Sequence, residues 1–156
     1  MYLKVLNNPI VSGLGLKIAL MSFSLLVKAY LLTTVVFFAI DILWLGVIAK
    51  NLYNKHLKRL LAPKVNWVAA IIFYLIFIVG IFYFAIVPSV EAASLEQAVL
   101  KGALFGFFTY ATYDLTNLAT LRGWPIKIVF IDIVWGSILT ASVSTAGFYI
   151  MNWLMV

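Results

Sequence analysis

The stretch Ile72–Ile86, "IFYLIFIVGIFYFAI", contains no charged residue, and its apolar character extends from about Val65 to Val87. A helix needs about 20 mainly apolar residues to cross the hydrocarbon core of a bilayer. We therefore predict a membrane-spanning helix here, and this prediction sets the reading of the rest of the chain.

The composition agrees with a membrane protein. Apolar residues make up 65% of the chain and charged residues only 10%, whereas soluble domains carry about 25% charged residues. Cysteine is absent and His56 is the single histidine, which excludes disulfides, thiolate metal sites and multi-histidine sites within one chain. The net charge of +6 could suggest nucleic acid, but the basic residues flank apolar runs. We expect the lipid bilayer and its anionic headgroups as partners, and no nucleic acid.

Four segments are long and apolar enough to be predicted as spans, so the fold class expected is all-α, a polytopic four-transmembrane-helix bundle formed by residues 21–156. Residues 1–20 are interrupted by asparagine, proline and glycine and are predicted to form a flexible or interfacial leader. The predicted spans are Phe23–Ala49, Val65–Val87, Leu95–Leu121 and Pro125–Trp153.

Two connections carry seven of the eleven basic residues, five in the first and two in the second. Positive charge is retained in the cytoplasm, so we expect these connections to be cytoplasmic, both termini to lie outside, and the first connection to contact lipid headgroups. The basic residues are Lys50, Lys55, Lys58, Arg59 and Lys64 between the first two spans, and Arg122 and Lys127 between the last two.

Three of the five acidic residues, Asp41, Asp114 and Asp132, fall inside predicted spans. At a rise of about 1.5 Å per residue, all three are expected in one layer near the cytoplasmic side. One ionised aspartate at the centre of a lipid-exposed helix costs roughly 2.5 to 3.5 kcal/mol. We therefore expect these carboxyl groups to be paired, hydrated or protonated, with at least one proton held unless a cation is bound.

Helical spacing places other polar and aromatic side chains on the faces of these acids. Asp41 and Asp132 each precede a tryptophan by three residues, in "DILW" and "DIVW". The cluster is predicted to bind a proton, a hard cation or the polar head of a substrate, and the alternative is a hydrogen-bonded network that fixes helix register. Oxygen ligands favour ions such as Mg²⁺, Ca²⁺, Mn²⁺ or Na⁺ over zinc, and the metal stays open. The predicted site residues are Asp41, Asp114, Asn117, Asp132, Tyr110, Trp44 and Trp135.

The third predicted span also carries small residues. Gly102 and Gly106 are spaced four apart, as in close-packed membrane helices, and we predict helix packing there together with a threonine face. Four short spans enclose little volume, so the protein is expected to form a homo-oligomer, through the two glycines, or to join a membrane complex. Interfacial belts of aromatic residues account for Tyr53, Trp67, Trp124 and Trp153, and the threonines concerned are Thr109, Thr112, Thr116 and Thr120.

Neither a nucleophile motif nor a phosphate-binding glycine loop nor a cofactor fingerprint is present, so we expect no cofactor and favour a protein that is not an enzyme. The leading hypothesis is proton- or cation-coupled transport of a small or amphipathic solute. One alternative is a non-catalytic accessory or assembly subunit of a larger membrane complex. A second alternative is a membrane-embedded lipid-modifying enzyme, with Asp114 as acid or base.

Three motifs carry a family resemblance: "FAIDILWLG" at 38–46, "YATYDLTNLATLRGWP" at 110–125 and "IDIVWGS" at 131–137. With the apolar stretch quoted first, they resemble the family of bacterial inner-membrane proteins known as domain of unknown function 2177, over about Met21 to Trp153. The resemblance implies a multi-pass, four-span protein of the bacterial inner membrane, and it implies no established biochemical activity.

Overall fold

The computed structural model describes residues 23–156, so the leader predicted for residues 1–20 lies outside the described residues. Within residues 23–156 every regular element is a helix, and the expected all-α class is confirmed for this part of the chain. Two short π-helices continue longer helices. The elements are α3 (Phe23–Leu43), η1 (Trp44–Ile48), α4 (Lys50–Leu57), α5 (Trp67–Ile81), η2 (Phe82–Ile86), α6 (Val87–Glu91), α7 (Leu95–Thr120) and α8 (Ile126–Leu154).

Three helical segments of the described chain are long and apolar enough to cross a membrane: Phe23–Ile48, Trp67–Glu91 and Ile126–Leu154. Large apolar side chains such as Val35 and Ile76 remain exposed along them, as expected for helices that face lipid. The fourth predicted span, α7, has 26 residues but is less apolar, because it carries charged residues, an asparagine and several threonines.

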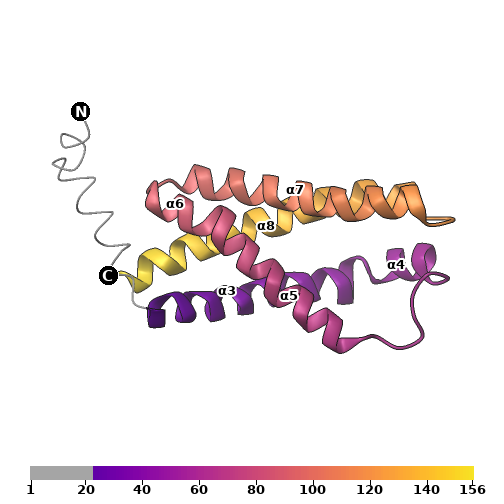
Figure 1. Ribbon diagram of the computed structural model, residues 1–156, viewed down its shortest axis with the longest axis horizontal. Helices are drawn as coiled ribbons and strands as arrows, with labels where there is room; N and C mark the ends of the chain where they lie inside the picture. The colour runs from indigo at the N-terminus through magenta and orange to yellow at the C-terminus, as the bar shows by residue number, and fades with distance from the viewer. Residues whose placement is uncertain (1–22) are drawn as a thin grey trace.

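The long helices are arranged so that both basic connections lie at the same end of the molecule (Figure 1). Helices α7 and α8 lie side by side along most of their length, and α5 crosses the bundle obliquely. Helix α4 and the turn between α7 and α8 meet at one end, while the start of α3 and the α6–α7 connection lie at the other.

Small residues bring α7 and α8 into close contact. Gly102 and Gly106 are buried against α8, and a methyl group at either would overlap the backbone of α8 and a neighbouring hydroxyl. The hydroxyl of Thr140 donates a hydrogen bond across the interface to the carbonyl of Gly102, at 2.7 Å. The expected use of these glycines in a contact between copies is wrong, because α8 of the same chain already covers them.

The predicted threonine packing face is also wrong for most of its length. Thr112, Thr116 and Thr120 are exposed, and the hydroxyls of Thr112 and Thr120 donate to backbone carbonyls four residues earlier in the same helix. Internal bonding of this kind satisfies a hydroxyl without a partner helix, so these side chains can face lipid.

The second span is longer than expected, since the helix continues past Pro88 to Glu91. A proline inside an α-helix clashes with the carbonyl four residues earlier. Here the wider turn of η2 ends at Ile86, immediately before α6, and Pro88 occupies the first turn of α6. The chain then turns, and Ser94 caps α7 by accepting a hydrogen bond from the amide of Gln97.

Candidate functional site

A polar chamber of about 350 Å³ opens where α4 approaches the main bundle. Two predicted aspartates line it, Asp41 from α3 and Asp132 from α8, and their side chains are only 4% and 8% exposed. Two tyrosines from other elements, Tyr53 of α4 and Tyr74 of α5, face them. We refer to this cavity as the acid chamber, and its lining is completed by Leu45, Leu57, Leu61, Phe73, Tyr110, Tyr113, Trp124 and Trp135.

Each chamber aspartate accepts a hydrogen bond from a tyrosine. Tyr53 donates from its hydroxyl to Oδ1 of Asp132 at 2.5 Å, and Tyr74 donates to Oδ2 of Asp41 at 2.9 Å. Trp44 in turn donates from its indole nitrogen to the Tyr53 hydroxyl at 3.1 Å. Burial, and then the hydrogen bond to Asp132, raise the pKa of Tyr53 above its ordinary value, so this phenol remains a donor at neutral pH.

The two repeated acid and tryptophan motifs meet face to face. The rings of Trp44 and Trp135 are stacked, with centroids 4.1 Å apart and planes 6° from parallel. The stack joins η1 to α8 beside Asp132, and it forms where a π-helix replaces the regular α-helical turn. The indole nitrogen of Trp135 is buried and makes no hydrogen bond, so it is a spare donor at the edge of the acid chamber.

Asp114 lies deeper than the other two aspartates. Its side chain is fully buried, Oδ1 accepts a hydrogen bond from the indole of Trp124 at 3.3 Å, and Oδ2 has no partner. Its carboxyl group is close enough to Asp132 for the two charges to repel each other. A buried carboxylate with one unpaired oxygen is costly, so this position has room in its chemistry for a proton or a positively charged group.

The structure therefore brings the predicted residues together in part. Asp41, Asp132, Tyr110 and Trp135 line one chamber and Trp44 adjoins it, whereas Asp114 is reached through Trp124, and Asn117 has a buried amide nitrogen without a partner. Among residues 23–156 the three carboxyl groups do not form a cluster of the kind that holds a metal ion.

Sequence reasoning missed three members of the site: Tyr53, Tyr74 and Trp124. Tyr53 and Trp124 were assigned to interfacial aromatic belts, but both instead donate hydrogen bonds to aspartates. The available signal was the shortage of hydrogen-bond partners for three buried acids, which calls for phenol and indole donors at the ends of neighbouring helices.

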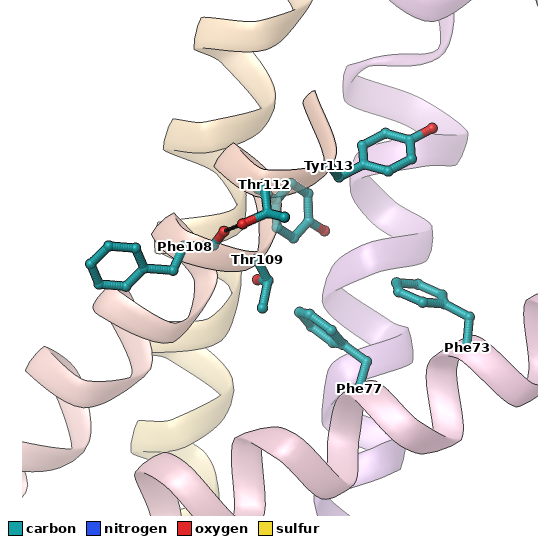
Figure 2. Close-up of a pocket in the computed structure, with 7 residues that line it drawn as sticks. Phe73, Phe77, Phe108, Thr109, Thr112 and Tyr113 are labelled. Carbon is teal, nitrogen blue, oxygen red and sulfur yellow. Dashed lines mark hydrogen bonds between the residues drawn. The ribbon is translucent and has the colours of Figure 1, made fainter. Parts of the chain in front are cut away.

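An apolar groove of about 700 Å³ adjoins the acid chamber between α5 and α7. Figure 2 shows Phe73 and Phe77 projecting from α5 toward α7, with Thr109 and Tyr113 on the facing side. Phe73, Tyr110 and Tyr113 line both the groove and the chamber. The two cavities therefore meet at shared side chains, one of them apolar and the other carrying carboxyl groups.

The position of Tyr110 depends on a glycine in α8. Any Cβ at Gly136 would overlap the Tyr110 ring, so the absence of a side chain at Gly136 lets the ring lie flat against α8. The same ring contacts Phe77 of α5, with centroids 6.2 Å apart. Gly136 thus fixes the side chain that separates the groove from the acid chamber.

Fold and site together define a helical membrane protein with buried carboxyl groups and an adjoining apolar groove. Residues 26–149 match the family described as "Predicted membrane protein (DUF2177)", and the chain belongs to this family. Comparison with curated proteins and with solved structures returned no match.

Proposed function

We propose that this protein binds an amphipathic solute inside the membrane and moves it in step with a proton or cation at the aspartates. The apolar part of the solute would occupy the groove between α5 and α7, and its polar head would enter the acid chamber. The observation that carries the proposal is the sharing of Phe73, Tyr110 and Tyr113 by the two cavities.

The size and lining of the groove support an apolar ligand group. Ligand pockets commonly enclose about 300 to 1,000 Å³ and have mainly hydrophobic and aromatic walls with a few polar groups. The groove, at about 700 Å³, has Phe73, Phe77 and Phe108 among its lining residues. Its polar contributions come from Thr109, Thr112 and the two tyrosines.

The donors and acceptors of the acid chamber favour a positively charged or hydrogen-bond-donating head. Asp41 and Asp132 are buried and each has one oxygen engaged by a tyrosine, and no Lys or Arg lines the chamber. An ammonium group entering it would meet two carboxyl groups, and charge-assisted hydrogen bonds are the stronger kind. The unpaired oxygen of Asp114 supports a coupled proton, because protonation would remove a buried charge.

We further propose that α7 is a fourth span and that the basic connections face the cytoplasm of a bacterial inner membrane. Support for the span comes from the contact of α7 with α8 along most of its length (Figure 1). Support for the orientation comes from the excess of basic residues at the end where α4 meets the α7–α8 turn.

Single cysteines test this topology directly, because the chain has none of its own. Glu91→Cys and Arg122→Cys flank α7 at its two ends. An impermeant maleimide added to right-side-out vesicles should label Glu91→Cys, and Arg122→Cys only after the vesicles are opened. Labelling of both from one side would refute the fourth span, and the unmodified chain provides the blank.

Binding is tested with dodecylamine, and with dodecanoate as a probe of the same length and opposite charge, on the purified full chain in nanodiscs. Quenching of tryptophan fluorescence by brominated forms of both probes should show tighter binding of the amine. Asp132→Asn should reduce amine binding, whereas Glu96→Gln, a matched change at an exposed acid, should leave it unchanged. Equal binding of the two probes, or an unaffected Asp132→Asn variant, would count against the proposed head group.

Transport is tested separately with the same proteins in proteoliposomes that carry an internal pH indicator. Amine added outside should drive a proton flux that Asp114→Asn abolishes and Glu96→Gln preserves. Binding without any flux dependent on Asp114 would refute coupled transport and leave a binding protein.

A further inference from the structure

A second cavity, of about 660 Å³, lies at the end of the molecule where α4 meets the α7–α8 turn. Its lining comes from two stretches that are far apart in the chain, residues 54–60 and residues 122–123. Figure 1 shows α4 and the α7–α8 turn next to each other at this end. We call this cavity the basic pocket.

The basic pocket carries a concentrated positive charge. Its lining includes Lys55, Lys58, Arg59 and Arg122, together with His56, and contains no acidic residue. Outside the membrane-spanning helices the nearest acids in sequence, Glu91 and Glu96, belong to the connection at the opposite end. Four like charges around one cavity repel one another, and an anion placed among them would relieve that repulsion.

Only part of the basic connection contributes to this pocket. Of the five basic residues between the first two spans, Lys55, Lys58 and Arg59 line it, and Lys50 and Lys64 do not. Arg122 is supplied by the other connection. The pocket is therefore a specific arrangement of two segments, and it differs from a general basic surface in that neighbouring lysines are left out.

Helix α4 separates the basic pocket from the acid chamber. Tyr53, Leu57 and Leu61, spaced four apart, line the acid chamber, while the intervening Lys55, His56, Lys58 and Arg59 line the basic pocket. On the other segment Trp124 belongs to the chamber, and Arg122 and Gly123 belong to the pocket. An anion that draws the two segments together would thus also hold the lid residues Tyr53 and Trp124 over their aspartates.

We propose that the basic pocket binds a phosphate-bearing anion with two or more negative charges, held by Arg59 and Arg122 from opposite sides. The planar guanidinium group matches phosphate oxygens through two parallel hydrogen bonds, and lysines add point charges. The pocket lies just beyond Ile48, where the first span ends, and before Ile126, where α8 begins. That depth suits the headgroup of an anionic lipid as well as a soluble phosphate compound.

The test measures binding to the full chain and compares two double variants of equal charge. Arg59→Gln with Arg122→Gln removes two charges from the pocket, and Lys50→Gln with Lys64→Gln removes two charges beside it. All four side chains are exposed, so both variants should fold, and helix content by circular dichroism checks this. The first probe is inorganic pyrophosphate, titrated calorimetrically into protein in detergent at low ionic strength.

The second probe is phosphatidic acid in nanodiscs of phosphatidylcholine, with retained lipid counted by native mass spectrometry. We expect the arginine variant to weaken binding of the probe that binds by about tenfold or more, since each arginine supplies charged hydrogen bonds, and the lysine variant to weaken it by about twofold or less. Retention of phosphatidic acid that pyrophosphate cannot displace would identify a lipid headgroup. Pyrophosphate binding without selective retention of phosphatidic acid would identify a soluble ligand.

Two results would overturn the proposal. Equal losses in the arginine and lysine variants would show that the whole basic surface attracts anions without a defined pocket. Failure of the wild-type chain to bind pyrophosphate, together with no preference for phosphatidic acid over phosphatidylcholine, would show that the pocket binds no phosphate. Neither result depends on the proposed binding of an amphipathic amine, which is measured with a different probe and different variants.

Discussion

The contact between α7 and α8 makes one substitution especially informative, Gly106→Ala. The added methyl group would overlap the carbonyl of Gly136 and the hydroxyl of Thr140, both on α8. Backbone atoms cannot rotate out of the way, so the two helices must separate locally. The hydroxyl of Thr140 also bridges to Gly102 one turn away at 2.7 Å, and separation would stretch this bond.

The size of the effect follows from these two terms. Inserting a methyl group into a well-packed interface costs about 1 to 3 kcal/mol, and an interhelical hydrogen bond in a membrane protein contributes about 0.6 kcal/mol. We therefore expect Gly106→Ala to lower the free energy of unfolding by about 2 to 4 kcal/mol. The measurement is reversible unfolding in mixed micelles, with dodecyl sulfate as the denaturant.

Gly46→Ala is the matched control, because a Cβ at Gly46 meets no atom within 4 Å. Alanine favours helix over glycine by up to about 1 kcal/mol, so this variant should be as stable as the wild type or slightly more stable. If Gly106→Ala is as stable as Gly46→Ala, α7 and α8 do not pack through these glycines, and the placement of Tyr110 and Asp114 would fall with that contact.

Three further predictions concern the acid chamber. Tyr53→Phe should lower the free energy of unfolding by about 1 to 3 kcal/mol because Asp132 loses a donor, whereas Tyr83→Phe, at a 70% exposed side chain, should change it by less than about 0.5 kcal/mol; the same micelle titration checks both. This contribution of Tyr53 should be fully present below pH 10.0, the ordinary tyrosine pKa, and be lost only as pH rises through the higher pKa of the folded chain, which unfolding at stepped pH would reveal. Gly136→Ala should displace the Tyr110 ring and weaken dodecylamine binding in the fluorescence assay, and unchanged binding would contradict the role given to Tyr110.

Composition and helical spacing were sufficient to predict much of the fold. Uninterrupted apolar runs predicted the three segments that are long and apolar enough to cross a membrane, and the repeated acid and tryptophan spacing placed Asp41 and Asp132 on faces that meet. These features are local, since one helix turn decides which residues share a face. The crossing of the membrane by α7, whose polar residues lower its hydropathy, remains a proposal.

The rest of the site depends on contacts that no local pattern encodes. Tyr53 reaches Asp132 across 79 positions of sequence, and it can do so only because α4 folds back against the bundle after η1. Similarly, the prediction that Gly102 and Gly106 join two copies is wrong because spacing alone shows a helix can be approached closely but does not say which helix approaches.

The π-helix Phe82–Ile86 changes how the second span tolerates insertions and deletions. A π turn accommodates one residue more than an α turn, so the residues after it are rotated by about 100° relative to an uninterrupted α-helix. Ile86, which lies over Gly147 of α8, faces α8 in this register. A one-residue deletion between 82 and 86 would restore a regular α-helix while turning everything up to Glu91 away from α8. The span would keep its apolar composition, and any count of apolar residues would miss the damage.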